Sequence, residues 1–355
     1  MALTSLGVQG ADMTVFAGTY TGNGAWGIYS SRFDSRNGSL SPAEIAIEER
    51  TNPSFLAIHG NYLYAANEND MGTVTAFSID GGRLTRLNVV KSDGSGPCHI
   101  AVDRTGKWLF VANYQSGTVT SLQIHQDGTL AEPVSFVQQS GSSKDRERQS
   151  GPHAHQVVPS PDNKYLLVPD LGADQVFVYR FDAQTGNLTR AGSGALPPGA
   201  GPRHLAFSPD AKYVYVVAEL TAMIYEFRWN APNLEALGSV SMLPAGYTGP
   251  KSGSEIEVHP NGKFVYASNR GHDSIAIFRL GADGKLQAAG EIPSGGKTPR
   301  NFAIDPSGKY LLVANQDSGT VVVFRIDPDT GSLTQTVNHR DIPFAVSLVF
   351  SNQYK

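Results

Sequence analysis

The chain has a single cysteine, Cys98, among its 355 residues. One cysteine excludes an internal disulfide and any zinc site built from several cysteines, and it fits a reducing compartment. We interpret Cys98 as a small buried strand residue. No apolar run approaches the roughly 20 residues that cross a bilayer, and the chain begins without the basic and apolar segments of a secretion signal. We therefore expect a cytoplasmic protein that makes no membrane contact.

Charge is also scarce, since charged residues make up 17% of the chain and the net charge is −4. No cluster of lysines and arginines is present, so the sequence offers no field that would attract nucleic acid. Hydrophobic residues make up 40%, and the chain has 38 glycines and 21 prolines. This composition indicates a large core built from short strands and many tight turns.

An internal repeat is the main positive signal. Residues 302–326 and 100–124 follow one template, and further copies begin at Leu56, Gln156 and Leu205, and also at Ile256. Each copy alternates short apolar runs with turns rich in Gly, Asn and Asp. One polar position recurs at intervals of 46, 57, 49, 50 and 46 residues, as Asn67, Asn113, Asp170, Glu219, Asn269 and Asn315. This period is typical of the four-stranded blades of a β-propeller.

The two ends of the chain complete each other. Residues 14–20, 27–33 and 43–47 match the second, third and fourth strands of a blade, and residues 344–350 match a lone innermost strand. Joining them gives a seventh blade and leaves no open sheet edge. We predict an all-β, seven-bladed propeller with four antiparallel strands per blade, formed by residues 14–355 as one domain behind a tail of residues 1–13.

Comparing the copies separates what the blade needs from what departs from it. Asp170 and Glu219 replace Asn in the recurring column, and Glu219 follows the apolar run 213–218. A turn residue or a structural ion pair would explain Glu219 as well as a functional carboxylate would. At the start of the innermost strands the aligned residues are Phe55, His99, His155, His204, Glu255 and Asn301, with Arg203 and Arg300 preceding two of them.

Residues at equivalent places around one axis must point toward one another, so this set favours a shared site over separate structural roles. Arg270 follows Asn269 and joins the same rim. His153 and His155, at i and i+2, could chelate a metal from one strand face. We rank a metal below proton transfer or anion binding because no further ligand stands at a fixed spacing. The charged insertion 139–152 is most simply a solvated loop, with a lid at the channel mouth as the alternative.

Seven short segments together resemble the lactonase-type seven-bladed propeller family, which includes propeller 6-phosphogluconolactonases and carboxy-muconate lactonising enzymes. These segments are Gly151–Gln156, Leu167–Gly172, Gly201–His204, Val217–Leu220, Ser254–Glu255, Ser268–Gly271 and Thr298–Asn301. The resemblance implies a metal-independent, cofactor-free site for an anionic lactone or a related acid. It places His155, Arg203, Glu219 and Arg270 on the catalytic positions of the lactonising branch. The substrate-binding residues that we expect beside them are His99, His153, Asp170, His204, Glu255, Arg300 and Asn301.

These residues suit lactone chemistry, because Glu219 and His155 can transfer protons and arginines can hold an anion. We expect a hydrolase that opens a sugar lactone, with 6-phosphogluconolactone of the pentose phosphate route as the specific candidate. A cycloisomerase of the muconate type is the alternative within the same family. A non-catalytic propeller that binds a protein through its rim is the contrasting class, which would need an exposed apolar patch but no inward His, Arg and Glu cluster.

Overall fold

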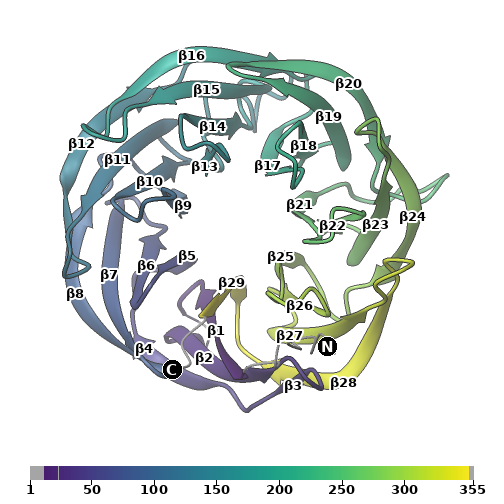
Figure 1. The fold of residues 1–355 in the computed structure, drawn as a ribbon, viewed down its shortest axis with the longest axis horizontal. Helices are drawn as coiled ribbons and strands as arrows, with labels where there is room; N and C mark the ends of the chain where they lie inside the picture. The colour runs from purple at the N-terminus through teal and green to yellow at the C-terminus, as the bar shows by residue number, and fades with distance from the viewer. Residues whose placement is uncertain (1–11, 23, 352–355) are drawn as a thin grey trace, which may run out of the picture.

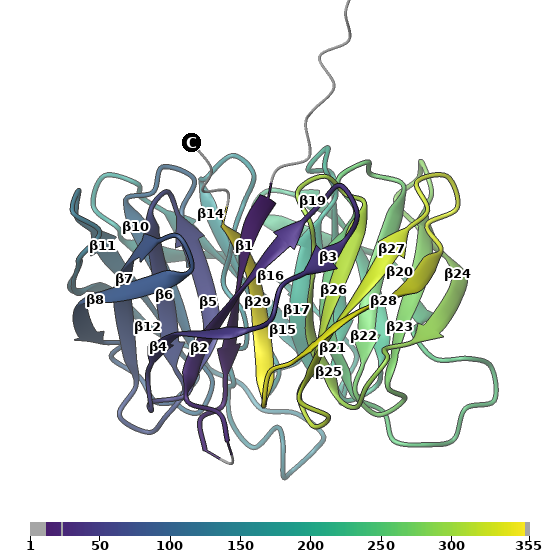
Figure 2. The same ribbon diagram turned by 90° about the horizontal axis from the view of Figure 1, so that it is seen from below.

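The repeats fold into antiparallel sheets, which the computed structural model describes over residues 12–22 and 24–351. In this part of the chain seven sheets stand around one axis (Figure 1), and the innermost strand of each runs along that axis (Figure 2). No helix there is long and apolar enough to cross a membrane. Of the segment expected as a tail, residues 1–11 lie outside the described residues, and Asp12 and Met13 belong to the first strand.

The strands follow one another from the axis outward in each blade. The first three blades contain β29 (Ala345–Ser351), β1 (Asp12–Thr19), β2 (Gly27–Asp34), β3 (Ser39–Leu40) and β4 (Glu44–Glu48); β5 (Pro53–His59), β6 (Tyr62–Asn67), β7 (Thr73–Asp80) and β8 (Arg83–Lys91); and β9 (Pro97–Val102), β10 (Trp108–Asn113), β11 (Thr118–Ile124) and β12 (Leu130–Gln138).

The other four blades contain β13 (Val158–Pro159), β14 (Tyr165–Asp170), β15 (Gln175–Phe181) and β16 (Leu188–Ala195); β17 (Pro202–Phe207), β18 (Tyr213–Ala218), β19 (Met223–Asn230) and β20 (Asn233–Ser241); β21 (Gly253–Val258), β22 (Phe264–Asn269), β23 (Ser274–Leu280) and β24 (Leu286–Pro293); and β25 (Pro299–Ile304), β26 (Tyr310–Asn315), β27 (Thr320–Ile326) and β28 (Leu333–Asp341). The predicted propeller is confirmed. The outer edge of the first blade differs slightly, because both β3 and β4 pair with β2.

The C-terminal strand closes the ring as predicted. β29 pairs antiparallel with β1, with Phe16 opposite Val349. Two further hydrogen bonds tie β29 to its neighbours: the Leu56 backbone N–H donates to Ser347 Oγ at 3.2 Å, and the Leu348 N–H donates to Asn301 Oδ1 at 2.8 Å. The first blade is therefore assembled from both ends of the chain.

Apolar side chains fill the spaces between neighbouring blades. Each of seven clusters of described residues combines side chains from two adjacent blades; Phe16 and Ile28 of the first blade, for example, pack with Leu63 and Phe77 of the second. Burial of one such side chain contributes about 1.5–3 kcal/mol. Because such a cluster lies at every interface between blades, a closed ring of apolar packing surrounds the polar groups at the axis.

The fourth blade departs from the others at its innermost strand. β13 has only two residues, and before it a single isolated bridge joins Ala154 to Asp170. The expected strand face shared by His153 and His155 is therefore wrong. The physical reason is that the buried Asp170 carboxylate takes the His153 N–H at 2.8 Å and the Ala173 N–H at 2.9 Å, which holds this segment in an irregular path.

Removal of residues 344–355 should open the ring, because β1 would lose its inner partner and leave an unpaired edge beside the axis. We expect the truncated protein to lose its single cooperative unfolding transition and to aggregate. Thermal unfolding by circular dichroism, together with light scattering, measures both properties. A soluble truncated protein with the parental melting temperature would show that the ring does not depend on β29.

Candidate active site

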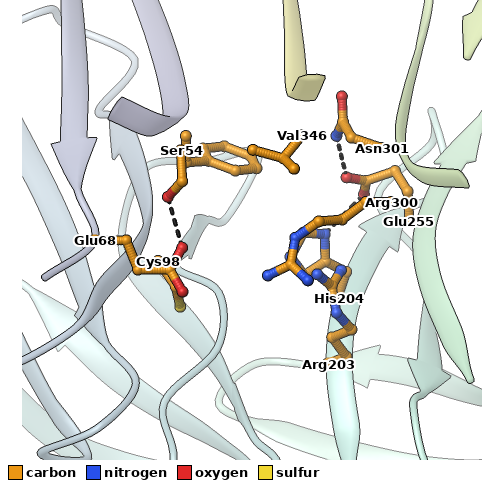
Figure 3. A pocket seen from close by; sticks show the side chains of 10 residues that line it. Ser54, Glu68, Cys98, Arg203, His204, Glu255, Arg300, Asn301 and Val346 are labelled. Carbon is orange, nitrogen blue, oxygen red and sulfur yellow. Dashed lines mark hydrogen bonds and ion pairs between the residues drawn. The ribbon is translucent and has the colours of Figure 1, made fainter. Parts of the chain in front are cut away.

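One pocket lies at the axis where the innermost strands begin. Figure 3 shows Ser54, Glu68 and Cys98 on one side of it, with arginines and His204 across from them. The residues that line this central pocket are Ser54, Phe55, Glu68, Cys98, Arg203, His204, Glu255, Arg300, Asn301 and Val346. Six different innermost strands, β5, β9, β17, β21, β25 and β29, supply nine of them. The pocket therefore exists only when the ring is closed.

Glu219 is a buried carboxylate surrounded by arginines. It directly follows β18, and its side chain is 7% exposed. Arg148 Nη2 lies 2.6 Å from Oε1, and Arg270 Nη2 lies 2.8 Å from Oε2. Arg203 Nε approaches Oε2 at 3.2 Å, and His155 Nε2 lies 4.0 Å from the same oxygen. The four predicted catalytic residues thus meet around one carboxylate.

The charge state of Glu219 bears on its predicted role. Burial disfavours the ionised form, but Arg270, Arg203 and Arg148 outweigh this effect and lower the pKa of the Glu219 carboxyl to about 2. A group with that pKa stays ionised at neutral pH and is a weak base, so it is poorly matched to proton transfer. Its contacts favour a role for Glu219 in balancing and orienting the arginines around it, and the role as general acid or base stays a prediction.

The arginines retain hydrogen-bonding capacity. Arg203 Nη1 and Arg270 Nε are buried and have no hydrogen-bond partner among the described residues. Arg203 Nε is ion-paired with Glu219 Oε2 at 3.2 Å, although this contact lacks the geometry of a hydrogen bond. Burial, with Arg270 and Arg300 nearby, lowers the pKa of Arg203 to about 10, so it remains charged at neutral pH. Buried polar groups normally find partners. Unfilled guanidinium N–H groups in a pocket are therefore a site for an anionic or carbonyl oxygen.

A second carboxylate fixes an imidazole beside these arginines. His204 Nδ1 lies 2.8 Å from Glu255 Oε1, and Asn301 Nδ2 donates to Glu255 Oε2 at 2.5 Å. Since a carboxylate only accepts, Nδ1 carries the proton, and Nε2 of His204 is left as an acceptor. Nε2 is buried without a hydrogen-bond partner among the described residues. Burial lowers the pKa of His204 below its usual range despite the nearby Glu255.

His99 and His155, which align with His204 in the comparison of the repeats, pack against it. The ring centroids of His99 and His155 each lie 5.3 Å from that of His204, and Phe55 lies 4.0 Å from His99. Burial, followed by the neighbouring cations, lowers the pKa of His155 well below its usual range, and burial with His204 does the same for His99. Both imidazoles are therefore neutral at neutral pH.

Two predicted substrate-binding residues have other roles. Asp170 is fully buried, and the hydrogen bonds of its side chain are to backbone N–H groups of its own blade. Burial raises the pKa of Asp170 to about 6. His153 stacks on Tyr114 with centroids 4.5 Å apart, and its Nδ1 donates to the Tyr114 carbonyl at 2.9 Å. Asp170 thus fixes the path of the chain, and His153 lies against Tyr114 beside the site.

Sequence reasoning missed several residues of the site. Arg300 Nη2 donates to the Tyr20 hydroxyl at 2.7 Å, and this hydroxyl donates to Glu68 Oε2 at 2.8 Å. Ser54 Oγ donates to the same oxygen at 2.6 Å. Their place in the repeat could have revealed them. Tyr20, Glu68 and Tyr114 lie just after the second strand of their blades, close to where Arg270 lies in its own blade.

The predictions for Cys98 and for the insertion 139–152 were incomplete. Cys98 is buried, as expected, but it lines the central pocket. Arg148, within the insertion expected as a solvated loop, reaches Glu219 and the Tyr114 hydroxyl. No group of three or more His, Cys, Asp or Glu residues in the described ranges is arranged to hold a metal.

Comparison with known proteins identifies the family. The profile described as "Lactonase, 7-bladed beta-propeller" matches residues 14–350. The chain belongs to this propeller lactonase family. The 6-phosphogluconolactonase of Bacillus subtilis is 37% identical over 346 residues, which cover 95% of this chain and 98% of that protein. The 6-phosphogluconolactonase of Formosa agariphila is 35% identical over 303 residues, 81% of this chain and 85% of that protein.

A solved structure extends the likeness to three dimensions. The periplasmic gluconolactonase of Pseudomonas aeruginosa superposes on this chain with a TM-score of 0.89 and 33% sequence identity, covering 96% of this chain and 99% of the other. The closed ring of the chain is thus shared with that structure.

Replacement of Glu219 by Gln should destabilise the protein at neutral pH, because the arginines would lose their buried counter-charge. Breaking one partner of a buried pair costs about 3–5 kcal/mol. A carboxyl with a lowered pKa stabilises the fold above its unfolded pKa, and this stabilisation is lost as the pH falls toward about 2. The difference in unfolding free energy between parent and Glu219→Gln should therefore shrink between pH 5 and pH 3 in urea titrations.

Glu235→Gln is the control, since Glu235 pairs with Arg228 at 3.8 Å on the surface and its side chain is 62% exposed. Its loss should cost less than about 1 kcal/mol. Equal stability of parent and Glu219→Gln at pH 7 would mean that the arginines do not need the carboxylate.

Proposed function

We propose that the protein is a hydrolase that opens an anionic sugar lactone, with 6-phosphogluconolactone as its substrate. The central pocket carries this proposal, because it places the unpartnered Nη1 of Arg203 beside the unpartnered Nε2 of His204. Two relatives named 6-phosphogluconolactonase, at 37% and 35% identity, support it. The inward cluster also favours an enzyme over a propeller that only binds a protein through its rim.

Lactone hydrolysis requires three catalytic functions from the site. A base must take a proton from water as the water oxygen bonds to the carbonyl carbon, and positive groups must stabilise the resulting oxyanion. The bond from that carbon to the ring oxygen then breaks, and the ring oxygen needs a proton. One imidazole can perform both proton transfers, since it accepts the first proton and returns it to the leaving oxygen.

His204 meets the requirements for this base. Glu255 accepts its Nδ1–H at 2.8 Å, Asn301 donates to Glu255, His204 lines the pocket, and its Nε2 has no hydrogen-bond partner among the described residues. A carboxylate in this position fixes the tautomer and stabilises the imidazolium that forms during the reaction, as in hydrolases with a Ser-His-Asp triad. Burial keeps His204 neutral at neutral pH, so it is ready to accept a proton.

Arg203 is the first candidate to stabilise the oxyanion. It is 2% exposed, lines the same pocket as His204, and its Nη1 has no hydrogen-bond partner in the described part of the chain. A guanidinium excluded from water acts strongly on developing charge because the local dielectric is low. Glu219 Oε2, at 3.2 Å from Arg203 Nε, keeps this cation oriented. His155, which is neutral and 4.0 Å from Glu219, is the second position for a proton-transfer group.

A panel of sugar lactones, assayed by proton release, tests the proposal. The parent should open 6-phosphogluconolactone faster than its spontaneous hydrolysis, and His204→Gln should lower kcat by about 10²–10⁴-fold, the usual contribution of a positioned base. His155→Gln serves as the matched control and should cost less. Loss of activity only in His155→Gln would move the base to that residue, and a parent inactive on every lactone would refute the function.

The pH profile separates a base from a structural histidine. Because His204 must be neutral to accept a proton, kcat should fall as the pH drops through its pKa, which lies below the usual value near 6.5. Glu255 raises the basicity of His204, so Glu255→Gln should shift this acid limb to lower pH while it lowers kcat. An acid limb at the same pH in parent and Glu255→Gln would contradict the pairing.

A further inference from the structure

The insertion between the third and fourth blades presents one arginine to the site from a fixed turn. Asp145 Oδ1 accepts the backbone N–H groups of Glu147 at 3.0 Å and Arg148 at 3.1 Å. Gln149 is fully buried, and its Nε2 donates to the Leu171 carbonyl at 2.8 Å. The backbone position of Arg148 is therefore set by contacts that do not involve its own side chain.

The guanidinium of Arg148 is held by one nitrogen. Nη2 donates to Glu219 Oε1 at 2.6 Å and to the Tyr114 hydroxyl at 3.2 Å. Nη1 and Nε form no hydrogen bond with any described residue. Glu219 and Tyr114 thus orient the planar group and leave N–H donors on two of its nitrogens free, each of which can donate to an oxygen of a phosphate or carboxylate.

Exposure distinguishes Arg148 from the other cations of the site. Its side chain is 43% exposed, whereas those of Arg203 and Arg270, which share Glu219 with it, are 3% and 14% exposed. Arg148 therefore lies at the outer side of the cluster, and Arg203 lies deep beside His204. A ligand that contacts both would lie with one end deep and the other toward the solvent.

We propose that Arg148 is a specificity-determining residue that binds the phosphate of the substrate. The inference rests on the proposed lactonase function, which puts the reacting carbonyl deep, at His204 and Arg203. The phosphate of 6-phosphogluconolactone is carried on the exocyclic carbon C6, outside the lactone ring that contains the carbonyl. Because Arg148 and Arg203 contact the same carboxylate, this arm spans from a carbonyl at Arg203 to Arg148. Binding it does not require Arg148 to release Glu219, because the two donors on Nη1 and Nε are free.

The experiment compares two stable open-chain acids, 6-phosphogluconate and gluconate, which differ by the phosphate alone. Isothermal titration calorimetry gives the Kd of each for the parent, Arg148→Ala, Arg148→Lys and Arg146→Ala. Arg146 is the matched control, since it is an exposed arginine two residues away in the same turn. The melting temperature of each variant shows that it is folded.

We expect the parent to prefer 6-phosphogluconate. Arg148→Ala should reduce this preference by about 10–100-fold, which corresponds to the loss of hydrogen bonds to a charged group. Arg148→Lys should retain part of it, because lysine keeps the charge but lacks the fork. Arg146→Ala should leave it unchanged. A KM for 6-phosphogluconolactone that rises in Arg148→Ala with little change in kcat would give the same result by kinetics.

Three outcomes would overturn the inference. Equal weakening of both acids by Arg148→Ala would assign Arg148 a general role in positioning Glu219. An unchanged preference would place the phosphate elsewhere, with Arg300 in the deep pocket as the next residue to replace. A parent with no preference for the phosphorylated acid would remove phosphate recognition itself. Each of these leaves the lactonase proposal standing if the parent opens lactones in the proton-release assay.

Discussion

Pairing of β29 with β1 is the constraint on which the rest of the molecule depends. It joins two ends of the chain that are more than 300 residues apart and turns a row of blades into a ring. A closed ring has no free inner edge, and it forces the innermost strands to surround one axis. Leu348 of β29 also donates to Asn301, which in turn holds Glu255 and through it His204. Closure and the chemistry of the site therefore share the same hydrogen bonds.

The site concentrates charge where little water is available. Arg148, Arg203, Arg270 and Arg300 meet Glu68, Glu219 and Glu255 near the axis. Like charges at such short range repel strongly, so the arginines are tolerated because carboxylates stand between them and because the apolar clusters between blades hold the strands rigidly. What remains unpaired, on Arg203 and His204, is the part of the site that a ligand can satisfy.

Comparison of the blades with one another predicted much of the site. His155, Arg203, Glu219 and Arg270 were singled out because the blade itself does not require them, and they lie together around one carboxylate. His204, Glu255 and Asn301 likewise form one chain of contacts. The same comparison aligned Glu68 and Tyr114 with Arg270. Because each of these residue types occurs there in only one blade, the comparison gave no reason to interpret them as functional residues and not as turn residues. Asp170 departed from Asn for a local structural reason.

The sequence by itself determined the number of blades, the strand order and the ring closure, because these follow from local periodicity and from the matching of two incomplete repeats. It also determined which residues face the axis, since equivalent positions in a repeat take equivalent places. Only the tertiary structure decided the charge states and the pairs. The pKa of Glu219 depends on three arginines, one from an insertion, one from its own blade and one from the next blade, and the free Nε2 of His204 depends on Glu255 in the next blade. Most of these contacts join residues about 50 or more positions apart, and their energies depend on distances and burial that no local pattern encodes.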